Sequence, residues 1–149
     1  MNNVLYLFLS LFLQSNIMIA EPPANSEMGK NSLYLEVGTN LLISTTSVNF
    51  EAYIGSSEKV HWYLRGGFGT TSIAFTGGGG GGLGALTMLT GAGKHHFETS
   101  AGIFISPALN SSVLPLLDLG YRFQNPEGGF VFRGKVGTLG VGVGIGYAF

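Results

Sequence analysis

The sequence predicts an all-β protein, an eight-stranded antiparallel up-and-down transmembrane β-barrel that is preceded by an N-terminal signal peptide. Three observations lead to this prediction. Only 10% of the 149 residues are charged and 25 are glycine, whereas a soluble domain usually carries about 25% charged residues. After the N-terminal segment, apolar residues alternate with polar or small ones, and turn-forming residues return about every 8–12 positions, as in sandwiches and barrels. Finally, the charged residues of the expected strands all fall on the face opposite the apolar one, because strand side chains alternate between faces.

Overall composition excludes several other classes of protein. The net charge is −1 and the isoelectric point is near 6.3, so the chain lacks the basic surface of a nucleic-acid-binding protein. The sequence contains no cysteine, which excludes disulfides, thiolate metal sites and thiol nucleophiles.

The N-terminus has the features of an export signal. Residues 4–13 read VLYLFLSLFL, and no charge precedes Glu21. This length suits the apolar region of a secretory signal, with cleavage after Ala20. The alternative is a retained membrane helix over residues 4–20, which is short for a span of about 20 apolar residues. We therefore expect a signal peptide at 1–20, a periplasmic tether at 21–30 and an outer-membrane β-barrel domain at 31–149.

The barrel domain divides into eight expected strands, most of them near the 9–11 residues that a tilted strand needs to cross a bilayer. They are 31–40, 44–54, 60–70, 83–91, 95–106, 113–124, 129–136 and 140–149. The segment 83–91, LGALTMLTG, does not show which face points outward. The glycine run Gly77–Gly82 is not followed by GK[ST], so it is not a phosphate-binding loop, and we expect a flexible extracellular loop there.

The last strand shows the alternation most clearly. Its one face carries Val141, Val143, Ile145, Tyr147 and Phe149, and its other face carries only glycine and alanine. Small inward residues opposite large ones are what a narrow barrel needs.

The charges of the strands form a balanced set of four acids and four bases. They are Glu36, Glu51, Arg65, Glu98, Asp118, Arg122, Arg133 and Lys135. Charges in a narrow lumen must pair to offset desolvation, so we expect an ionic network inside the barrel. Alternation alone also allows a charged exterior around an apolar core.

Aromatic residues favour the membrane barrel. If the C-terminus is periplasmic, most outward rings lie near the periplasmic ends of their strands, as in an interfacial girdle. These rings are Trp62, Phe97, Tyr121, Phe123, Phe130, Phe132, Tyr147 and Phe149.

A final strand of alternating apolar residues that ends in Phe149, with Tyr147 two positions before it, resembles the assembly signal of bacterial outer-membrane barrels. The strings GKHHFETSAGIF (93–104) and GYRFQNPEGGFVFR (120–133) resemble small uncharacterised outer-membrane β-barrel proteins of Bacteroidota-type bacteria. This resemblance implies export, insertion by the barrel-assembly machinery and an eight-stranded barrel. It implies no catalytic residues.

Candidate chemical groups are few. His95 and His96 are adjacent and point to opposite faces of a strand. An inward His61 could approach His96, Glu98 or Glu51 as a metal site, although a hydrogen-bonded histidine is the simpler interpretation. Ser100, His61 and Asp118 could form a triad only if the fold brings them together. We assign no catalytic, cofactor-binding or metal residue.

The resulting hypothesis is a non-enzymatic outer-membrane protein with a structural or surface-interaction role and a lumen filled by side chains. Its expected partners are outer-membrane lipid and the barrel-assembly machinery, without nucleic acid or cofactor. Two alternatives are a lipid-modifying barrel enzyme, an acyl hydrolase or transferase, and a soluble exported barrel that binds a small apolar ligand.

Overall fold

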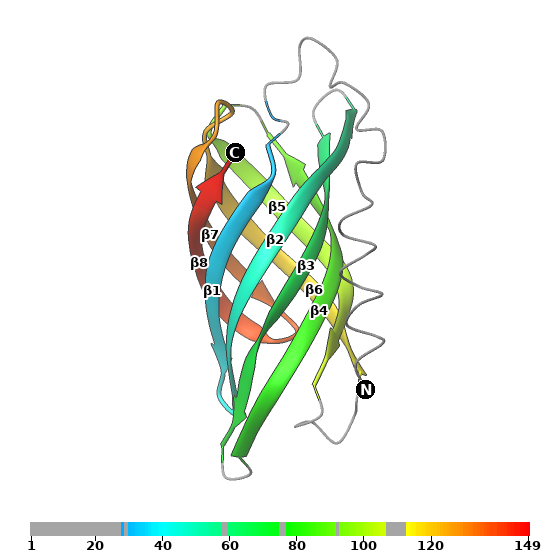
Figure 1. Cartoon of the computed structure of the whole chain (residues 1–149), viewed down its shortest axis with the longest axis vertical. Coiled ribbons are helices and arrows are strands. Elements are labelled where there is room, and N and C mark those ends of the chain that lie inside the picture. The colour runs from blue at the N-terminus through cyan, green and yellow to red at the C-terminus, as the bar shows by residue number, and fades with distance from the viewer. Residues whose placement is uncertain (1–27, 29, 58–59, 75–76, 92, 107–112) are drawn as a thin grey trace.

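Eight strands follow one another around a closed barrel (Figure 1). The computed structural model describes residues 28, 30–57, 60–74, 77–91, 93–106 and 113–149. Within these residues the strands are β1 (Ser32–Asn40), β2 (Ile43–Ser57), β3 (Val60–Ile73), β4 (Gly77–Thr90), β5 (His95–Ile105), β6 (Val113–Gln124), β7 (Gly129–Gly137) and β8 (Gly140–Ala148).

The strand order confirms the predicted all-β, antiparallel, up-and-down topology. Each strand pairs with its neighbour in sequence, and β8 closes the barrel by pairing with β1 from Ser32↔Ala148 to Thr39↔Val141. Closure leaves no free strand edge around the middle of the barrel. Among the described residues, no helix is long and apolar enough to cross a membrane.

The prediction for Gly77–Gly82 was wrong, because this run is the first part of β4 and not a loop. All six glycines pair with β3, from Ile73↔Gly77 to Phe68↔Gly82. Glycine has a low intrinsic preference for strands, but pairing with a neighbouring strand decides the outcome here. β4 also has a defined phase, since Ala85, Thr87 and Leu89 are buried inside the barrel.

The N-terminal expectations lie mostly outside the described residues. The signal peptide at 1–20 and most of the tether at 21–30 belong to this part. Met28, which the tether interpretation left free, is 1% exposed and packs with Tyr53, Tyr63 and Leu89.

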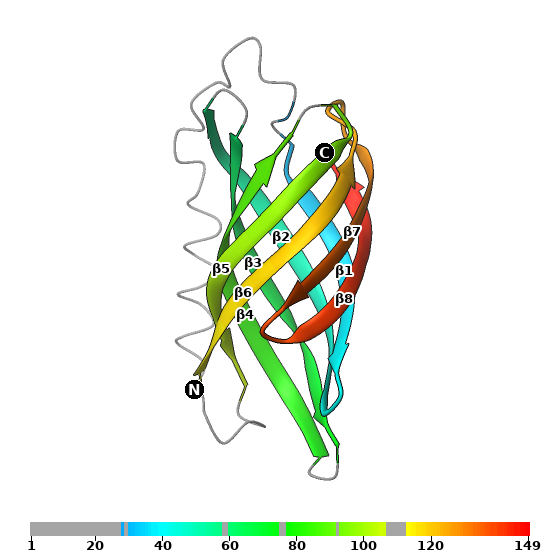
Figure 2. The ribbon, with the colours of Figure 1, turned by 180° about the vertical axis from the view of Figure 1, so that it is seen from behind.

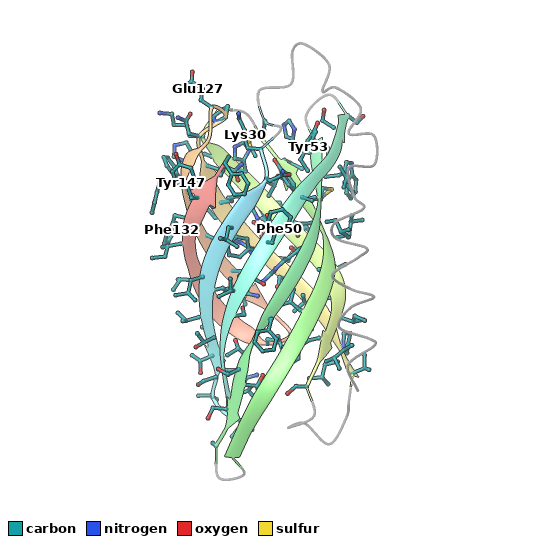
Figure 3. The ribbon with its side chains drawn as sticks, in the orientation of Figure 1. Lys30, Phe50, Tyr53, Glu127, Phe132 and Tyr147 are labelled. Carbon is teal, nitrogen blue, oxygen red and sulfur yellow. The ribbon has the colours of Figure 1, made fainter. Side chains whose placement is uncertain are left out.

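Residues alternate between a polar interior and an apolar exterior. On β1, Leu33, Leu35 and Val37 are exposed, while Tyr34 and Glu36 between them are buried. Figure 3 shows Phe132 and Tyr147 projecting away from the barrel near the end that holds the C-terminus. The eight outward rings expected for the aromatic girdle all lie on this outer face.

The interior has three layers along the barrel axis. An apolar cluster of Met28, Tyr53, Tyr63 and Leu89 lies toward the end with the termini, and we call it the terminal cluster. A second, the distal cluster, lies at the opposite end and contains Ala85, Phe104, Leu116 and Leu139. The charged side chains occupy the layer between them.

The end of the barrel away from the termini is uneven. Strands β2, β3 and β4 extend beyond the short β7–β8 hairpin, as both views show (Figures 1 and 2). This hairpin turns at Thr138 and Leu139 and continues at Gly140, whose φ of 100° favours glycine.

Candidate functional site

The middle layer gathers all eight charged residues that the strand alternation assigned to the lumen. They come from β1, β2, β3, β5, β6 and β7, whereas β4 and β8 contain no charged residue. The three arginine side chains and the Glu51 side chain are at most 1% exposed. Such burial is tolerated only when each charge has partners.

Four of these residues, Glu51, Glu98, Arg122 and Arg133, form a closed ring of alternating charge next to the terminal cluster, which we call the terminal quartet. Arg122 lies 2.6 Å from Glu51 and 2.7 Å from Glu98. Arg133 lies 3.6 Å from Glu51 and also contacts Glu98. Each arginine therefore bridges both glutamates.

The other four, Glu36, Arg65, Asp118 and Lys135, form a second closed ring, the distal quartet. The Lys135 ammonium lies 2.7 Å from Glu36 and 2.8 Å from Asp118. Arg65 lies 3.0 Å from Glu36 and 3.6 Å from Asp118. Glu36 also lies 3.2 Å from Arg133 of the terminal quartet, so the two neutral rings form one connected network.

Tyr34 is the central neutral partner of both quartets. Its hydroxyl donates to Glu51 at 2.8 Å, and the Arg133 guanidinium lies 4.4 Å from its ring centroid. Arg65 and Arg122 lie 5.6 and 5.9 Å from the same centroid. Within this range a cation is attracted to the face of an aromatic ring.

Two amides add hydrogen bonds to the arginines. Asn49 Oδ1 accepts from Nε and Nη2 of Arg65, both at 3.2 Å. Gln124 Oε1 accepts from Arg122 at 3.3 Å. Sequence reasoning missed Tyr34, Asn49 and Gln124, although each lies two positions from a lumen charge and so faces the same way.

Glycines of β8 make room for the long basic side chains of β7. A Cβ atom at Gly142 would lie 3.2 Å from Lys135 Cε, and one at Gly144 would lie 3.6 Å from Arg133 Cδ. The expectation of small inward residues opposite large ones therefore has a specific cause here, since β8 leaves its interior space to the two quartets.

The network leaves little free volume in the lumen. A cavity beside Glu36 and Lys135, bounded also by Thr45 and Leu139, has a volume of ≈ 10 Å³. This is about enough for one water molecule. The apolar clusters lie on both sides of the network, so the arrangement is suited to holding the strands together.

Two members of the triad considered from the sequence, Ser100 and Asp118, have partners outside it. The Ser100 hydroxyl lies 2.9 Å from Thr87 Oγ1, and the Asp118 carboxylate is engaged by Lys135 and Arg65. His96 Nε2 lies 3.0 Å from the Gly93 carbonyl oxygen. In the described part of the chain, no three His, Asp or Glu side chains form a group that could hold a metal ion.

Tyr147 and Phe149, the residues of the expected assembly signal, lie outside the barrel at the seam between β8 and β1. Both are exposed, and Phe149 also contacts Phe50 of β2. Two backbone hydrogen bonds hold the chain end in this position. Phe149 N donates to Asn31 O at 2.9 Å, and Asn31 N donates to Phe149 O at 3.1 Å.

No protein-family model matches the chain, and no match is found among curated proteins or solved structures.

Proposed function

We propose that this protein is a non-enzymatic β-barrel of the bacterial outer membrane, with a structural or surface-interaction role and a lumen filled by side chains. The barrel would be exported, lose its signal peptide near Ala20 and insert through the barrel-assembly machinery. Outer-membrane lipid would then surround its outer face.

The observation that carries this proposal is the inverted distribution of side chains. Leu64, Val143 and Ile145 on the outer face are 57%, 51% and 54% exposed, whereas Glu51 and Arg122 inside are fully buried. Soluble proteins rarely expose apolar patches beyond a few hundred Å². A lipid-facing barrel needs such a surface, because lipid covers it.

The closed strand topology supports the same proposal. In a bilayer every backbone polar group must be paired within the protein, and only helices and closed barrels achieve this. The strands contain 9–15 residues, which meets the length of about 9–11 residues for a tilted spanning strand. The outward rings at the end with the C-terminus suit a membrane–water interface.

The filled interior supports a structural or interaction role over transport or catalysis. The charged side chains of the two quartets pair with one another, so none of these charges is left for a substrate or an ion in transit. The lumen cavity beside them has room for about one water molecule. Interaction surfaces would then lie at the ends of the barrel, and the extended β2–β4 strands provide one.

The test is to express the full chain in a bacterium with an outer membrane and to determine its processing and its location. We expect the mature protein to begin near Glu21 and to fractionate with outer membranes. It should also migrate faster on gels when the sample is not heated, since closed barrels resist detergent. Recovery of the intact Met1 form from the inner membrane, or of the whole protein from the soluble periplasm, would contradict the proposal.

A further inference from the structure

β4 extends past β5 at the end of the barrel away from the termini. Gly82 pairs with Ile105, the last residue of β5, whereas among the described residues Gly77–Gly81 pair only with β3. Figures 1 and 2 show β3 and β4 running beyond the β5 strand. The free side of such a strand presents unpaired backbone N–H and C=O groups to any chain that can align with it.

The hydrogen-bond alternation identifies which glycines face this free edge. Gln124 N donates to the Lys94 carbonyl at 3.0 Å, so even-numbered β5 residues bond to β6 and odd-numbered ones, including Ile105, bond to β4. Its partner Gly82 therefore faces β5. By the same alternation Gly80 and Gly78 face the free edge, and both are exposed.

The fold requires glycine at part of this edge, since Gly77 has a φ of 94° and a Cβ atom at Gly78 or Gly81 would lie 2.5 or 2.7 Å from a backbone oxygen. It does not require glycine at Gly80 or Gly82. A Cβ atom at Gly80 or Gly82 would meet nothing closer than 3.6 Å, and neither residue has a positive φ. Alanine would fit at both positions. Glycine weakens a strand, and where it recurs it often marks a place that another backbone approaches closely.

A second strand that extends past its neighbour, β6, has an edge that other parts of the chain cover. β6 extends past β7, whose first pair is Asp118↔Gly137. Thr138 caps this overhang: its N–H donates to Leu117 O at 3.0 Å and its hydroxyl to Pro115 O at 3.0 Å. Pro115 itself offers no N–H. Proline and covering loops are usual means of blocking edges, and the described residues beside Gly78 and Gly80 supply only one weak contact, from the Ser106 hydroxyl to Gly80 O at 3.4 Å.

We propose that the edge Gly77–Gly81 binds an extended, uncharged peptide segment of another protein by strand addition. Gly78 and Gly80 would supply the backbone donors and acceptors. The partner should be uncharged, since the sequence from Gly66 to Gly93 contains no charged residue. The inference rests on the proposed function only for its location at the cell surface.

Side chains on β3 indicate the alternation that the peptide should have. Phe68 is 71% exposed on the outer face, and its Cε2 atom lies 4.0 Å from the Cβ position of Gly80. Thr71 faces inward opposite Gly79, and its Oγ1 is buried without a hydrogen-bond partner. An apolar residue beside Phe68 and a polar residue toward Thr71 would suit the two faces.

The test uses full-length protein folded in detergent and a fluorescent synthetic peptide with the sequence of residues 68–73, FGTTSI, which pairs with Gly77–Gly82 on the other edge of β4. We expect saturable binding by fluorescence anisotropy, unchanged over a roughly tenfold range of salt because no charges are involved. Gly80→Ala keeps the edge N–H and should bind within about threefold of wild type. Gly80→Pro removes the N–H and should bind at least about tenfold more weakly.

A second arm keeps the protein unaltered in case Gly80→Pro does not fold. Two probe peptides are N-methylated, one at the amides that face β4 and one at the alternate amides, and only the second should bind. Equal binding of both probes, or no saturable binding, would overturn the inference. So would protection of the Gly78 and Gly80 amides from hydrogen exchange before peptide is added, because residues 107–112 or a second copy of the chain would then already occupy the edge. These outcomes in detergent leave the outer-membrane proposal untouched, and fractionation tests that proposal separately.

Discussion

Phe149 and Phe50 meet on the outside of the barrel with their ring centroids 6.5 Å apart and their planes inclined by 38°. The contact joins the last residue of the chain to β2 across β1, so it spans the seam that closes the barrel. Aromatic pairs of this geometry contribute about 0.5–1.5 kcal/mol beyond their buried area. Phe149 could thus matter either as a modest structural contact or as a signal that the assembly machinery reads.

Deletion of Phe149 separates these two roles. The contact alone predicts near-normal refolding into detergent and near-normal levels in the outer membrane. The signal hypothesis predicts near-normal refolding in vitro but protein that accumulates in the periplasm or is degraded in cells. Phe50→Ala removes the same ring contact without altering the terminus and serves as the matched control. Normal outer-membrane levels of the deletion variant would exclude the signal role.

Arg122→Leu should destabilise the barrel strongly, because it leaves Glu51 and Glu98 to share Arg133. Removal of one partner from a buried ionic cluster costs about 3–5 kcal/mol. Urea unfolding of the refolded barrel, followed by heat-modifiable mobility, measures this loss. Lys94→Leu removes an exposed charge from a turn and should change the unfolding free energy by less than about 0.5 kcal/mol. Equal midpoints for the two variants would contradict an interior network.

The closed distal quartet makes a prediction about paired substitutions. Asp118→Leu and Lys135→Met together leave Arg65 bound to Glu36 at 3.0 Å, so the remaining charges still balance. The double variant should therefore be more stable than either single variant, since replacing a whole buried pair is often nearly neutral. A double-mutant cycle in urea gives the coupling, and strictly additive losses would show that the two side chains do not interact.

Glycine positions inside and outside the barrel should respond differently to the same methyl group. A Cβ atom at Gly146 would overlap Leu33 and Tyr34, whereas one at Gly134, on the outer face of β7, meets nothing within 4 Å. Overpacking of this kind costs about 1–3 kcal/mol. Gly146→Ala should thus lower the urea midpoint, and Gly134→Ala should leave it unchanged or raised. A lower urea midpoint for Gly134→Ala than for Gly146→Ala would contradict the assignment of Gly146 to the inner face of the barrel.

The strand alternation made most of the fold and the site predictable. Because the charges lie on one face of each strand, the sequence pattern places Glu51 and Arg122 on the same face, and the positions of the aromatic rings favour the lumen for that face. Both residues lie in the terminal quartet. The division into two rings was not predictable. Which acid meets which base depends on the stagger between strands, and a single sequence does not specify this register.

The failures share a physical cause. The expectation of a loop at Gly77–Gly82 gave local preference more weight than pairing with β3. Met28 and Leu139 lie outside the alternating strands, so no periodicity indicated that they fold into the apolar clusters. Tyr34 shares the phase of Glu36 and could have been placed inside by the rule that located the charges.

Lysine substitutions on one face of β3 should locate the membrane boundary. Leu64, Phe68, Thr70 and Ser72 all point outward, and the side chains change from apolar to hydroxyl after Phe68. In the proposed membrane barrel, lipid contact would end at this change. A lysine at the bilayer midplane costs about 2–4 kcal/mol, and one near an interface costs about 0–1 kcal/mol. Leu64→Lys should therefore insert poorly into vesicles and lower the amount of protein in the outer membrane, while Thr70→Lys should behave like wild type. In detergent above its critical concentration, where the apolar layer adapts to the protein, the difference should shrink. If Leu64→Lys inserted as well as Thr70→Lys did, the outer face would not be facing lipid, and the soluble exported barrel would become the better hypothesis.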